Sequence, residues 1–454
     1  MIKIKINSKN VKKGDIFLAI KGINSDGHDY IEDAIKNGAE EIICEKGEYS
    51  VKTTKVRNTR KYLVRYLKDN YYDEIKDIKL IGITGTSGKT TTAFLTYELL
   101  KSFGENVAYI GTNGFYINDF IKSIDNTTPD IYELYELLLF CKNENVKIVV
   151  MEISSHALKL KRLESLYFDI ACFTNLSSEH MDFHKNMRNY FNSKKKLFKL
   201  LRNNKIAIIN EGKYSKKLMR IKNKNILVKK SDITNIKYFI NKTEFYFKSE
   251  KYIIPLVGYY NILNYLDALL IVNSLGYKIK DIKKIQVNAP IGRMEMIEYK
   301  NNVIFIDYAH KPDAVSKVLD LANEIKEEKI YVVIGCGGDR DKTKRPVMGK
   351  ISTDLSDFVV FTNDNPRTEK AEDILSDIIR NLKNDNFKII KDRKKAILYA
   401  MNLLSNKDIL LILGKGHENY QIIGKTKKYF SDKEIVLSQI NFDLKNVDIK
   451  KNIW

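Results

Sequence analysis

Short apolar segments alternate with stretches of helical periodicity along most of the chain. Residues 16–20 have the uninterrupted apolar character of a buried strand, and residues 30–37 that of a short helix ending at Gly38. A β-branched strand at 79–84 runs into a glycine-containing loop, and a helix is expected over 91–103. Further buried strands are expected at residues 146–153, 206–209, 303–307, 330–334, 358–362 and 409–413.

This alternation predicts an α/β protein whose sheets are mostly parallel. At about 150 residues per domain, 454 residues allow three domains. We expect a small α/β domain over 1–76, a central, mostly parallel α/β domain over 77–291, and a doubly wound, Rossmann-like α/β domain over 292–454. Polar loops after the strands of the last domain lie where such sheets bind ligands.

Composition narrows the functional classes. Hydrophobic residues make up 44% of the chain, enough for packed cores. Its apolar runs are far shorter than the roughly 20 residues that span a bilayer, and the first ten residues lack an apolar signal core. A cytoplasmic protein without membrane insertion is therefore expected. The four cysteines form no Cys-x-x-Cys pair, so buried reduced thiols are expected rather than zinc or disulfides.

The net charge of +21, from 78 basic and 57 acidic residues, raises the possibility of nucleic-acid binding. The short basic runs are scattered, however, and no nucleic-acid module accompanies them. We expect a lysine-rich solvated surface, no nucleic-acid partner, and some attraction for anionic substrates such as nucleotides.

The strand–loop–helix at residues 79–103 predicts a nucleotide site. Glycines let backbone amides approach phosphate oxygens, Lys89 would contact the β- and γ-phosphates, and the Thr90 hydroxyl would hold Mg²⁺. The spacing differs from the common phosphate-binding loop, which has glycine where Ile83 stands. The alternative is a structural turn. The loop and helix start consist of Gly85, Thr86, Ser87, Gly88, Lys89, Thr90 and Thr91.

Two further segments carry candidate metal ligands. Glu152 ends an apolar strand, where its carboxylate would suit Mg²⁺ or, equally, a structural salt bridge. His180 and His184 are four residues apart and would share a helical face, as zinc ligands do, but no third soft ligand follows them.

Four polar, glycine-rich loops follow the strands of the last third. Because parallel strands end at one edge, these loops should converge on a site for a zwitterionic or anionic molecule. Their sequences are residues 307–313 (DYAHKPD), 335–341 (GCGGDRD), 364–367 (DNPR) and 414–418 (GKGHE).

Taken in order, Gly-Thr-Ser-Gly-Lys-Thr at 85–90, Ser-Ser-His-Ala-Leu at 154–158, Asp-Tyr-Ala-His-Lys-Pro-Asp at 307–313 and Gly-Lys-Gly-His-Glu at 414–418 resemble the Mur ligase family, in particular its MurE branch. The resemblance covers nearly the whole chain. It implies an ATP-dependent ligase of peptidoglycan precursor synthesis, in which an acyl phosphate forms on the D-Glu side chain of UDP-N-acetylmuramoyl-L-Ala-D-Glu and an amino acid displaces the phosphate.

The resemblance also implies residue roles at the catalytic and ATP sites. Lys89 and Thr90 would handle the γ-phosphate and the first Mg²⁺, with Glu152 as a metal partner. His180 and Lys194, the latter as a carbamate, would hold a second metal. The remaining ATP contacts would come from Asn261, Asn264, Arg293, Asp307 and His310, with Tyr308 shaping the pocket.

For the other two substrates, the implied UDP-substrate contacts are Ser8, Asn126, Thr127, Thr128, Ser154 and Arg162. The implied amino-acid pocket consists of Arg340, Asp364, Asn365, Arg367, Gly414 and Glu418. The 364–367 loop is the form seen in diaminopimelate-adding members. Arg367 could bind a distal carboxylate bidentately and would repel the ammonium of lysine. Meso-lanthionine, a near-isostere, would fit as well.

Three alternatives are weighed against a diamino diacid ligase: a lysine-adding ligase of the same family, a folylpolyglutamate synthetase-like ligase, and a basic ATPase stimulated by nucleic acid. The amino-terminal domain and the 364–367 loop disfavour the second, and the lack of any base-reading loop disfavours the third. We expect a monomer.

Overall fold

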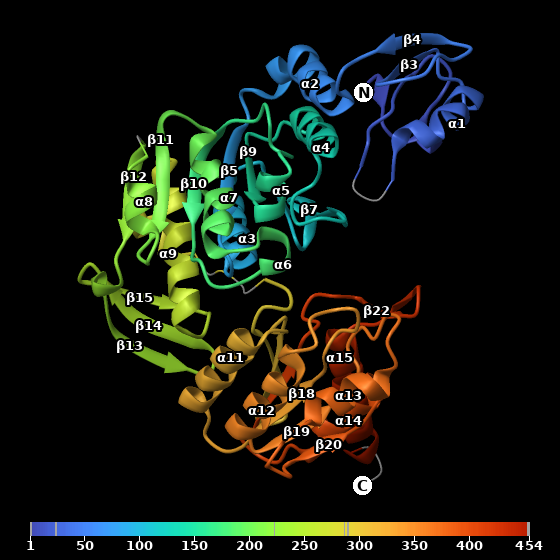
Figure 1. Ribbon diagram of the computed structural model, residues 1–454. Coiled ribbons are helices and arrows are strands. Elements are labelled where there is room, and N and C mark those ends of the chain that lie inside the picture. Colours follow the sequence, from blue (N-terminus) through green and yellow to red (C-terminus); the bar gives the residue numbers. More distant parts are fainter. Residues whose placement is uncertain (1, 23–24, 222, 286, 288–289, 452–454) are drawn as a thin grey trace. The chain divides into compact units, whose positions relative to one another are not determined.

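The structure, a computed structural model, describes residues 2–22, 25–221, 223–285, 287 and 290–451. The chain divides into two compact units (Figure 1). The first consists of Met1–Val228 with Leu270–Tyr277, and the second of Lys229–Leu269 with Lys278–Trp454. Each unit is described separately below.

The first unit begins with a four-stranded parallel sheet in the order β1-β2-β3-β4. Its strands are β1 (Ile4–Lys5), β2 (Ile16–Leu18), β3 (Glu41–Cys44) and β4 (Lys52–Lys55). Helix α1 (Ile31–Lys36) ends before Gly38, whose φ of 100° is one that glycine adopts readily. Helix α2 (Thr59–Ile75) then packs against α4 (Ile131–Asn143).

The larger sheet of the first unit has eight strands in the order β12-β11-β10-β5-β9-β6-β7-β8. Strand β5 (Lys79–Thr84) lies between β9 (Ile148–Glu152) and β10 (Phe168–Phe173), all parallel, so three loops emerge side by side at one edge. The other strands are β6 (Val107–Gly111), β7 (Gly114–Ile117), β8 (Asp119–Lys122), β11 (Leu201–Asn210) and β12 (Lys224–Val228). The associated helices are α3 (Lys89–Ser102), α5 (Ser155–Lys159), α6 (Met181–His184), α7 (Met187–Lys199) and α8 (Ser215–Met219).

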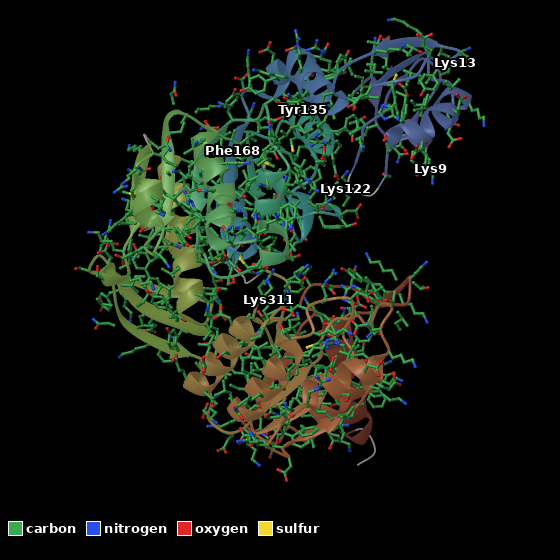
Figure 2. The ribbon with its side chains drawn as sticks, viewed as in Figure 1. Lys9, Lys13, Lys122, Tyr135, Phe168 and Lys311 are labelled. Carbon is green, nitrogen blue, oxygen red and sulfur yellow. The ribbon has the colours of Figure 1, made fainter. Side chains whose placement is uncertain are left out.

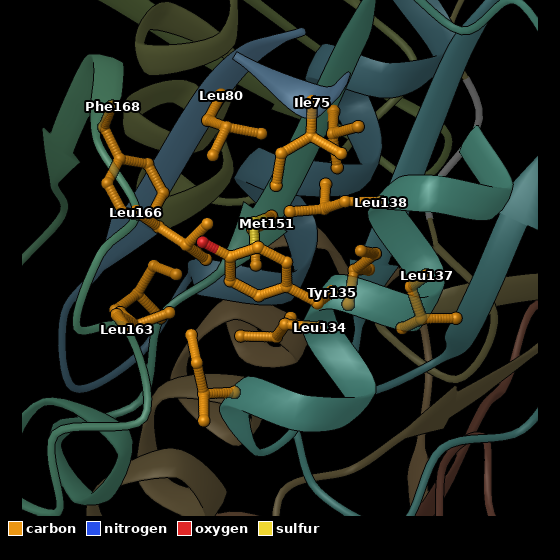
Figure 3. Packing of buried hydrophobic residues seen from close by; sticks show 14 of the residues in the cluster. Ile75, Leu80, Leu134, Tyr135, Leu137, Leu138, Met151, Leu163, Leu166 and Phe168 are labelled. Atoms are coloured by element: carbon orange, nitrogen blue, oxygen red, sulfur yellow. The ribbon is translucent and has the colours of Figure 1, made fainter. Parts of the chain in front are cut away.

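A single apolar cluster joins α2, α4 and one face of this sheet. Figure 3 shows Tyr135 of α4 among residues of this cluster that include Leu80 of β5 and Met151 of β9. Tyr135 and Phe168 are fully buried. Burying such side chains stabilises the fold by about 1.5–3 kcal/mol each. This packing therefore helps to fix the position of β5 and β9, the strands that precede two of the loops.

The second unit combines two sheets and a hairpin. A three-stranded antiparallel sheet contains β13 (Ile233–Phe239), β14 (Lys242–Phe247) and β15 (Glu250–Ile254). A six-stranded sheet has the order β16-β17-β21-β18-β19-β20 and is parallel except for β16. Its strands are β16 (Glu295–Tyr299), β17 (Asn302–Asp307), β18 (Ile330–Ile334), β19 (Phe358–Phe361), β20 (Phe387–Ile389) and β21 (Ile409–Leu413), and the hairpin is β22 (Tyr420–Ile423) with β23 (Thr426–Tyr429).

Helices α11 (Pro312–Ile325), α12 (Lys344–Leu355), α13 (Ala371–Ile379), α14 (Arg393–Leu403) and α15 (Asp432–Lys451) complete the second unit, with the short α10 (Ile279–Ile282). Helix α9 (Tyr259–Ser274) belongs partly to each unit.

The mostly parallel α/β class expected from the sequence is confirmed. The structure adds strands that the sequence analysis did not predict. They include the parallel strands β6 and β10 of the larger sheet, the antiparallel strands β7 and β8, the β13–β15 sheet and the β22–β23 hairpin. Among them, β8, β13 and β23 are largely exposed, and β14 alternates buried with half-buried residues, so these four lack the continuous apolar runs of the buried parallel strands. The proposed boundaries at 76/77 and 291/292 stay predictions.

The thiols are free and buried, as expected from the sequence. Lys9, Lys13 and Lys122 are exposed, whereas Tyr135 and Phe168 are buried (Figure 2). All four cysteines are free and buried, and burial raises the pKa of the Cys141 and Cys336 thiols to about 12. Within the described residues, no helix combines the length and apolar character that crossing a membrane requires.

Candidate active site

The loop between β5 and α3 is built for close backbone approach. Gly88 adopts a left-handed conformation (φ 83°) and caps α3, which begins at Lys89. A Cβ on Gly85 would lie 1.9 Å from the Thr174 hydroxyl oxygen, so only glycine fits there. The amides at the start of α3 and the helix dipole favour an anion at this point.

The segment after β10 fixes the shape of this loop. The Ser87 amide donates to Asn175 Oδ1 (2.9 Å), and Asn175 Nδ2 returns a bond to the Ser87 carbonyl (3.0 Å). The Thr86 amide donates to the Asn175 carbonyl (3.0 Å). A single asparagine therefore clamps the loop through both ends of its side-chain amide.

Glu152 is fully buried at the end of β9, where it pairs with Ile83 of β5. Its Oε2 accepts hydrogen bonds from the Thr90 hydroxyl (2.8 Å) and the Thr112 hydroxyl (3.2 Å). Its Oε1 accepts from the Tyr109 hydroxyl (2.6 Å) and the Thr112 amide (2.8 Å). Burial, and then the charge of Glu152, raise the pKa of Tyr109 well above its usual value, so the phenol stays protonated and donates.

Two lysines meet one carbonyl of the loop. Lys89 Nζ donates to the carbonyls of Gly85 (3.1 Å) and Thr86 (2.9 Å), while Lys194 Nζ donates to that of Gly85 (2.6 Å). Lys194 is only 1% exposed and its ammonium lies 4.6 Å from the centre of the Tyr190 ring. Lys194 is thus buried against the loop between β5 and α3.

The three histidines of this region do not form a zinc site. His180 has a φ of 55° and precedes α6, and its ring lies 4.7 Å from that of His156. His184 bonds through Nε2 to the Ser155 hydroxyl (2.9 Å), and burial lowers its pKa to about 4. Among the residues that the structure describes, no three His, Cys, Asp or Glu side chains gather as a metal site made of those ligands alone would require.

Several candidate UDP-substrate residues gather behind Glu152. The Thr128 hydroxyl donates to the Glu152 carbonyl (2.8 Å) and accepts from the Ser154 amide (2.9 Å). Arg162 Nη1 donates to the Thr128 carbonyl (3.1 Å), and the Thr127 hydroxyl lies 3.1 Å from that of Thr112. Asn126 is exposed in the same loop, whereas Ser8 is buried in the amino-terminal sheet region, apart from these residues in sequence and fold.

The candidate ATP residues of the second unit form two groups. In α9, Asn264 Nδ2 donates to Asn261 Oδ1 (3.1 Å). At the end of β17, Asp307 accepts from the amides of Met294 (2.8 Å) and Ala309 (2.7 Å). The pKa of Asp307 is raised by its burial.

An aromatic and cationic cluster adjoins Asp307. The Arg293 guanidinium lies 4.8 Å from the centre of the Tyr308 ring, and the rings of His310 and His417 lie 4.6 and 5.0 Å from it. Burial lowers the pKa of His310 and of His417 to about 3, so both rings are neutral at physiological pH. Aromatic rings next to a guanidinium offer stacking contacts of the kind that suit a nucleobase.

The loops after β18, β19 and β21 contain the candidate amino-acid pocket. Asn365 Nδ2 donates to Glu418 Oε2 (2.8 Å), and Arg367 Nη1 donates to the Gly338 carbonyl (2.9 Å). Gly414 (φ 112°) lies so close to Asp364 that a Cβ would be 2.9 Å from the carboxylate. Arg340 is exposed and bonds to the Asp339 carbonyl (3.1 Å), so it does not join the Asn365–Glu418 pair.

Sequence reasoning assigned no role to Tyr109, Thr112, Asn175 or Lys415, each of which bonds directly to a candidate residue. Thr112 and Asn175 follow buried strands of the same sheet, which was the available signal. Tyr109 lies within a strand and gave none.

Most of the chain matches protein-family models. Residues 3–74 match the model for the Mur ligase family, catalytic domain, residues 83–272 that for the Mur ligase middle domain, and residues 292–416 that for the Mur ligase, glutamate ligase domain. UDP-N-acetylmuramoyl-L-alanyl-D-glutamate–2,6-diaminopimelate ligase 1 of Clostridium acetobutylicum is 39% identical over 450 residues, covering 95% of this chain and 92% of its own. The chain belongs to the Mur ligase family.

Solved structures agree with the assignment. A structure of a UDP-N-acetylmuramoyl-L-alanyl-D-glutamate–2,6-diaminopimelate ligase superposes with a TM-score of 0.69 at 28% identity, covering 97% of this chain and 94% of its own. The MurF ligase of Thermotoga maritima in complex with ADP shares the fold (TM-score 0.65, 23% identity, covering 90% and 93%). Family membership makes the chain an ATP-dependent ligase with the three Mur ligase domains in order.

Replacing Gly85 with alanine should damage nucleotide binding because the new Cβ cannot avoid the Thr174 hydroxyl. We expect at least a ten-fold rise in the Kd of a fluorescent ADP analogue, which corresponds to about 1.4 kcal/mol. Gly212→Ala is the matched control, since nothing lies within 4 Å of its added Cβ. Equal affinity in the two variants would contradict the assigned role of the loop.

The neutral His310 and His417 should make the second unit sensitive to acid. Because their pKa values of about 3 lie below the usual 6.5, stability present above pH 6.5 is lost as the pH falls towards 3. Lowering the pH from 7.5 to 5.5 should reduce the free energy of unfolding by roughly 1 kcal/mol for each histidine. The fall in melting temperature over this range should be smaller in His310→Gln/His417→Gln than in the parent, and an identical fall would disprove the assignment.

Proposed function

We propose that this ligase adds a diamino diacid, meso-diaminopimelate or a close analogue such as meso-lanthionine, to the D-Glu of UDP-N-acetylmuramoyl-L-Ala-D-Glu. The observation that supports the proposal is that one residue of the second unit, Asn365, contacts two side chains of opposite charge. These are the Arg367 guanidinium and the Glu418 carboxylate. A distal carboxylate and a distal ammonium would find their counterions there. The named relatives at 35–39% identity support the same substrates.

The reaction has two steps. The D-Glu side-chain carboxylate attacks the γ-phosphorus of ATP, giving an acyl phosphate and ADP; the amine of the diamino acid then attacks the acyl carbon, and phosphate and a proton leave. The positive charge of Lys89, at the start of α3, would stabilise the negative charge on the phosphoryl group during its transfer. Thr127, Thr128 and Arg162 would hold the muramoyl peptide beside Glu152.

The residues present fit Mg²⁺. Glu152 and Thr90 offer hard oxygen atoms 2.8 Å apart at the loop, and His180 and a carbamylated Lys194 would complete a second position. Bound there, Mg²⁺ would neutralise the charge of the triphosphate. A bare ammonium on Lys194 would repel the metal, whereas a carbamate carries the opposite charge.

We propose that the enzyme acts in the cytoplasm, where ATP and UDP-linked precursors occur. We also propose that it is a monomer and uses no nucleic acid.

The substrate assignment is tested by phosphate release from ATP. Release should require both UDP-N-acetylmuramoyl-L-Ala-D-Glu and diaminopimelate, with lysine a poor replacement. Arg367→Asn, in which asparagine tolerates the φ of 52°, should raise the KM for diaminopimelate at least ten-fold and leave the KM for ATP unchanged. Arg380→Asn is the control, an exposed arginine of the same unit. Lysine outcompeting diaminopimelate, or equal losses for both substrates, would refute the assignment.

The carbamate on Lys194 is tested separately. Lys194→Ala should abolish phosphate release and regain part of it in added formate or acetate, because a small carboxylate can replace the missing group. The neighbouring Lys195→Ala should retain activity. With ¹³C-bicarbonate, the parent but not Lys194→Ala should show a carbamate carbon signal by NMR. Full activity of Lys194→Ala would exclude this role.

A further inference from the structure

A buried lysine next to the proposed acceptor pocket has no place in the reaction described so far. Lys415 is fully buried, which lysine almost never is without partners. Its Nζ donates to Glu418 Oε2 (3.0 Å) and Asn365 Oδ1 (3.3 Å), and it lies 5.4 Å from the centre of the Tyr420 ring. Both of these hydrogen bonds therefore go to residues that would bind the acceptor amino acid.

These contacts fix the orientation of the Asn365 amide. Asn365 Oδ1 accepts from Lys415 Nζ and from the Ile422 amide (2.9 Å), both of which can only donate. Asn365 Nδ2 must then point to Glu418 Oε2 (2.8 Å). The two donors on Oε2 hold the carboxylate of Glu418 in one orientation, so its second oxygen has a defined direction.

The Ile422 amide belongs to the β22–β23 hairpin, which also holds the other end of the pocket. The Arg367 amide donates to the Ile422 carbonyl (3.0 Å), and the Gly424 amide donates to the Arg367 carbonyl (2.7 Å). Gln421 Nε2 donates to the Asp364 carbonyl (2.6 Å). Arg367 has a φ of 52°, a costly conformation for a non-glycine residue that persists only when its surroundings enforce it.

We propose that Lys415 is a positioning residue that orients Glu418 for the distal ammonium of the acceptor, and that the β22–β23 hairpin determines specificity by holding Arg367 for the distal carboxylate. This rests on the proposed function. Two analogues separate the two ends. 2-Aminopimelate keeps the distal carboxylate and lacks the distal amine, whereas lysine keeps the distal amine and lacks the carboxylate.

The experiment measures kcat/KM for diaminopimelate, 2-aminopimelate and lysine in the full-length protein. The parent should prefer diaminopimelate to both analogues. Lys415→Met should lose at least ten-fold of the preference over 2-aminopimelate, mainly through the KM for diaminopimelate, and keep its preference over lysine and its KM for ATP. Gln421→Ala should show the reverse pattern with a smaller loss of about three-fold. Lys428→Met, an exposed lysine of the same hairpin, should match the parent.

Melting temperatures separate misfolding from mispositioning, and Lys415→Arg, which keeps the charge, should recover part of the lost preference. A parent that does not use diaminopimelate would reject the proposed function and this inference together. A parent that uses diaminopimelate, with its preference over 2-aminopimelate unchanged in a folded Lys415→Met, would reject the inference alone. A uniform loss for all three acceptors would also reject it, because it would indicate a purely structural lysine.

Discussion

A carboxylate removed from water must find its hydrogen bonds within the protein, and in the first unit Glu152 imposes this requirement. Its four donors come from the start of α3, from β6 and from the residue after β6. The backbone carbonyl of the same residue accepts a hydrogen bond from the Thr128 hydroxyl. The start of α3 and the segment that contains Thr128 are therefore both bonded to the end of β9, so a displacement of one would affect the other.

In the second unit, buried arginines make comparable sets of hydrogen bonds. Arg345 binds Glu369 through two nitrogens (2.9 and 3.0 Å) and Asp377 (3.0 Å), and it also donates to the Gly337 carbonyl (3.2 Å). Arg393 pairs with Asp432 and donates to the Leu413 carbonyl (3.0 Å). These pairs fasten the loops after β18, β19 and β21 to the helices behind them. Such pairs add little net stability, but breaking one would leave a charge buried and unpaired.

The sequence predicted the parts of the fold that apolar periodicity encodes. The strands at 79–84, 330–334 and 409–413 occur with those limits. The candidate loops also fall at one edge of each sheet because parallel strands require it. The hairpin that holds Arg367 was not predictable, since its strands contain no fully buried residue and its bonds to residues 364–367 span more than 50 positions. Lys415 belongs to a motif noted in the sequence, but its burial depends on contacts with residues far away in the chain, which the local sequence does not indicate.

The buried thiols have a consequence for chemistry applied from outside. Since all four cysteines are enclosed and those at 141 and 336 resist ionisation near neutral pH, alkylating reagents should find no reactive sulfur on the folded protein. A cysteine that replaces an exposed lysine would then be the one thiol that a dye, a spin label or a surface-coupling reagent could modify. The native chain is thus a ready scaffold for site-specific labelling without first removing its own thiols.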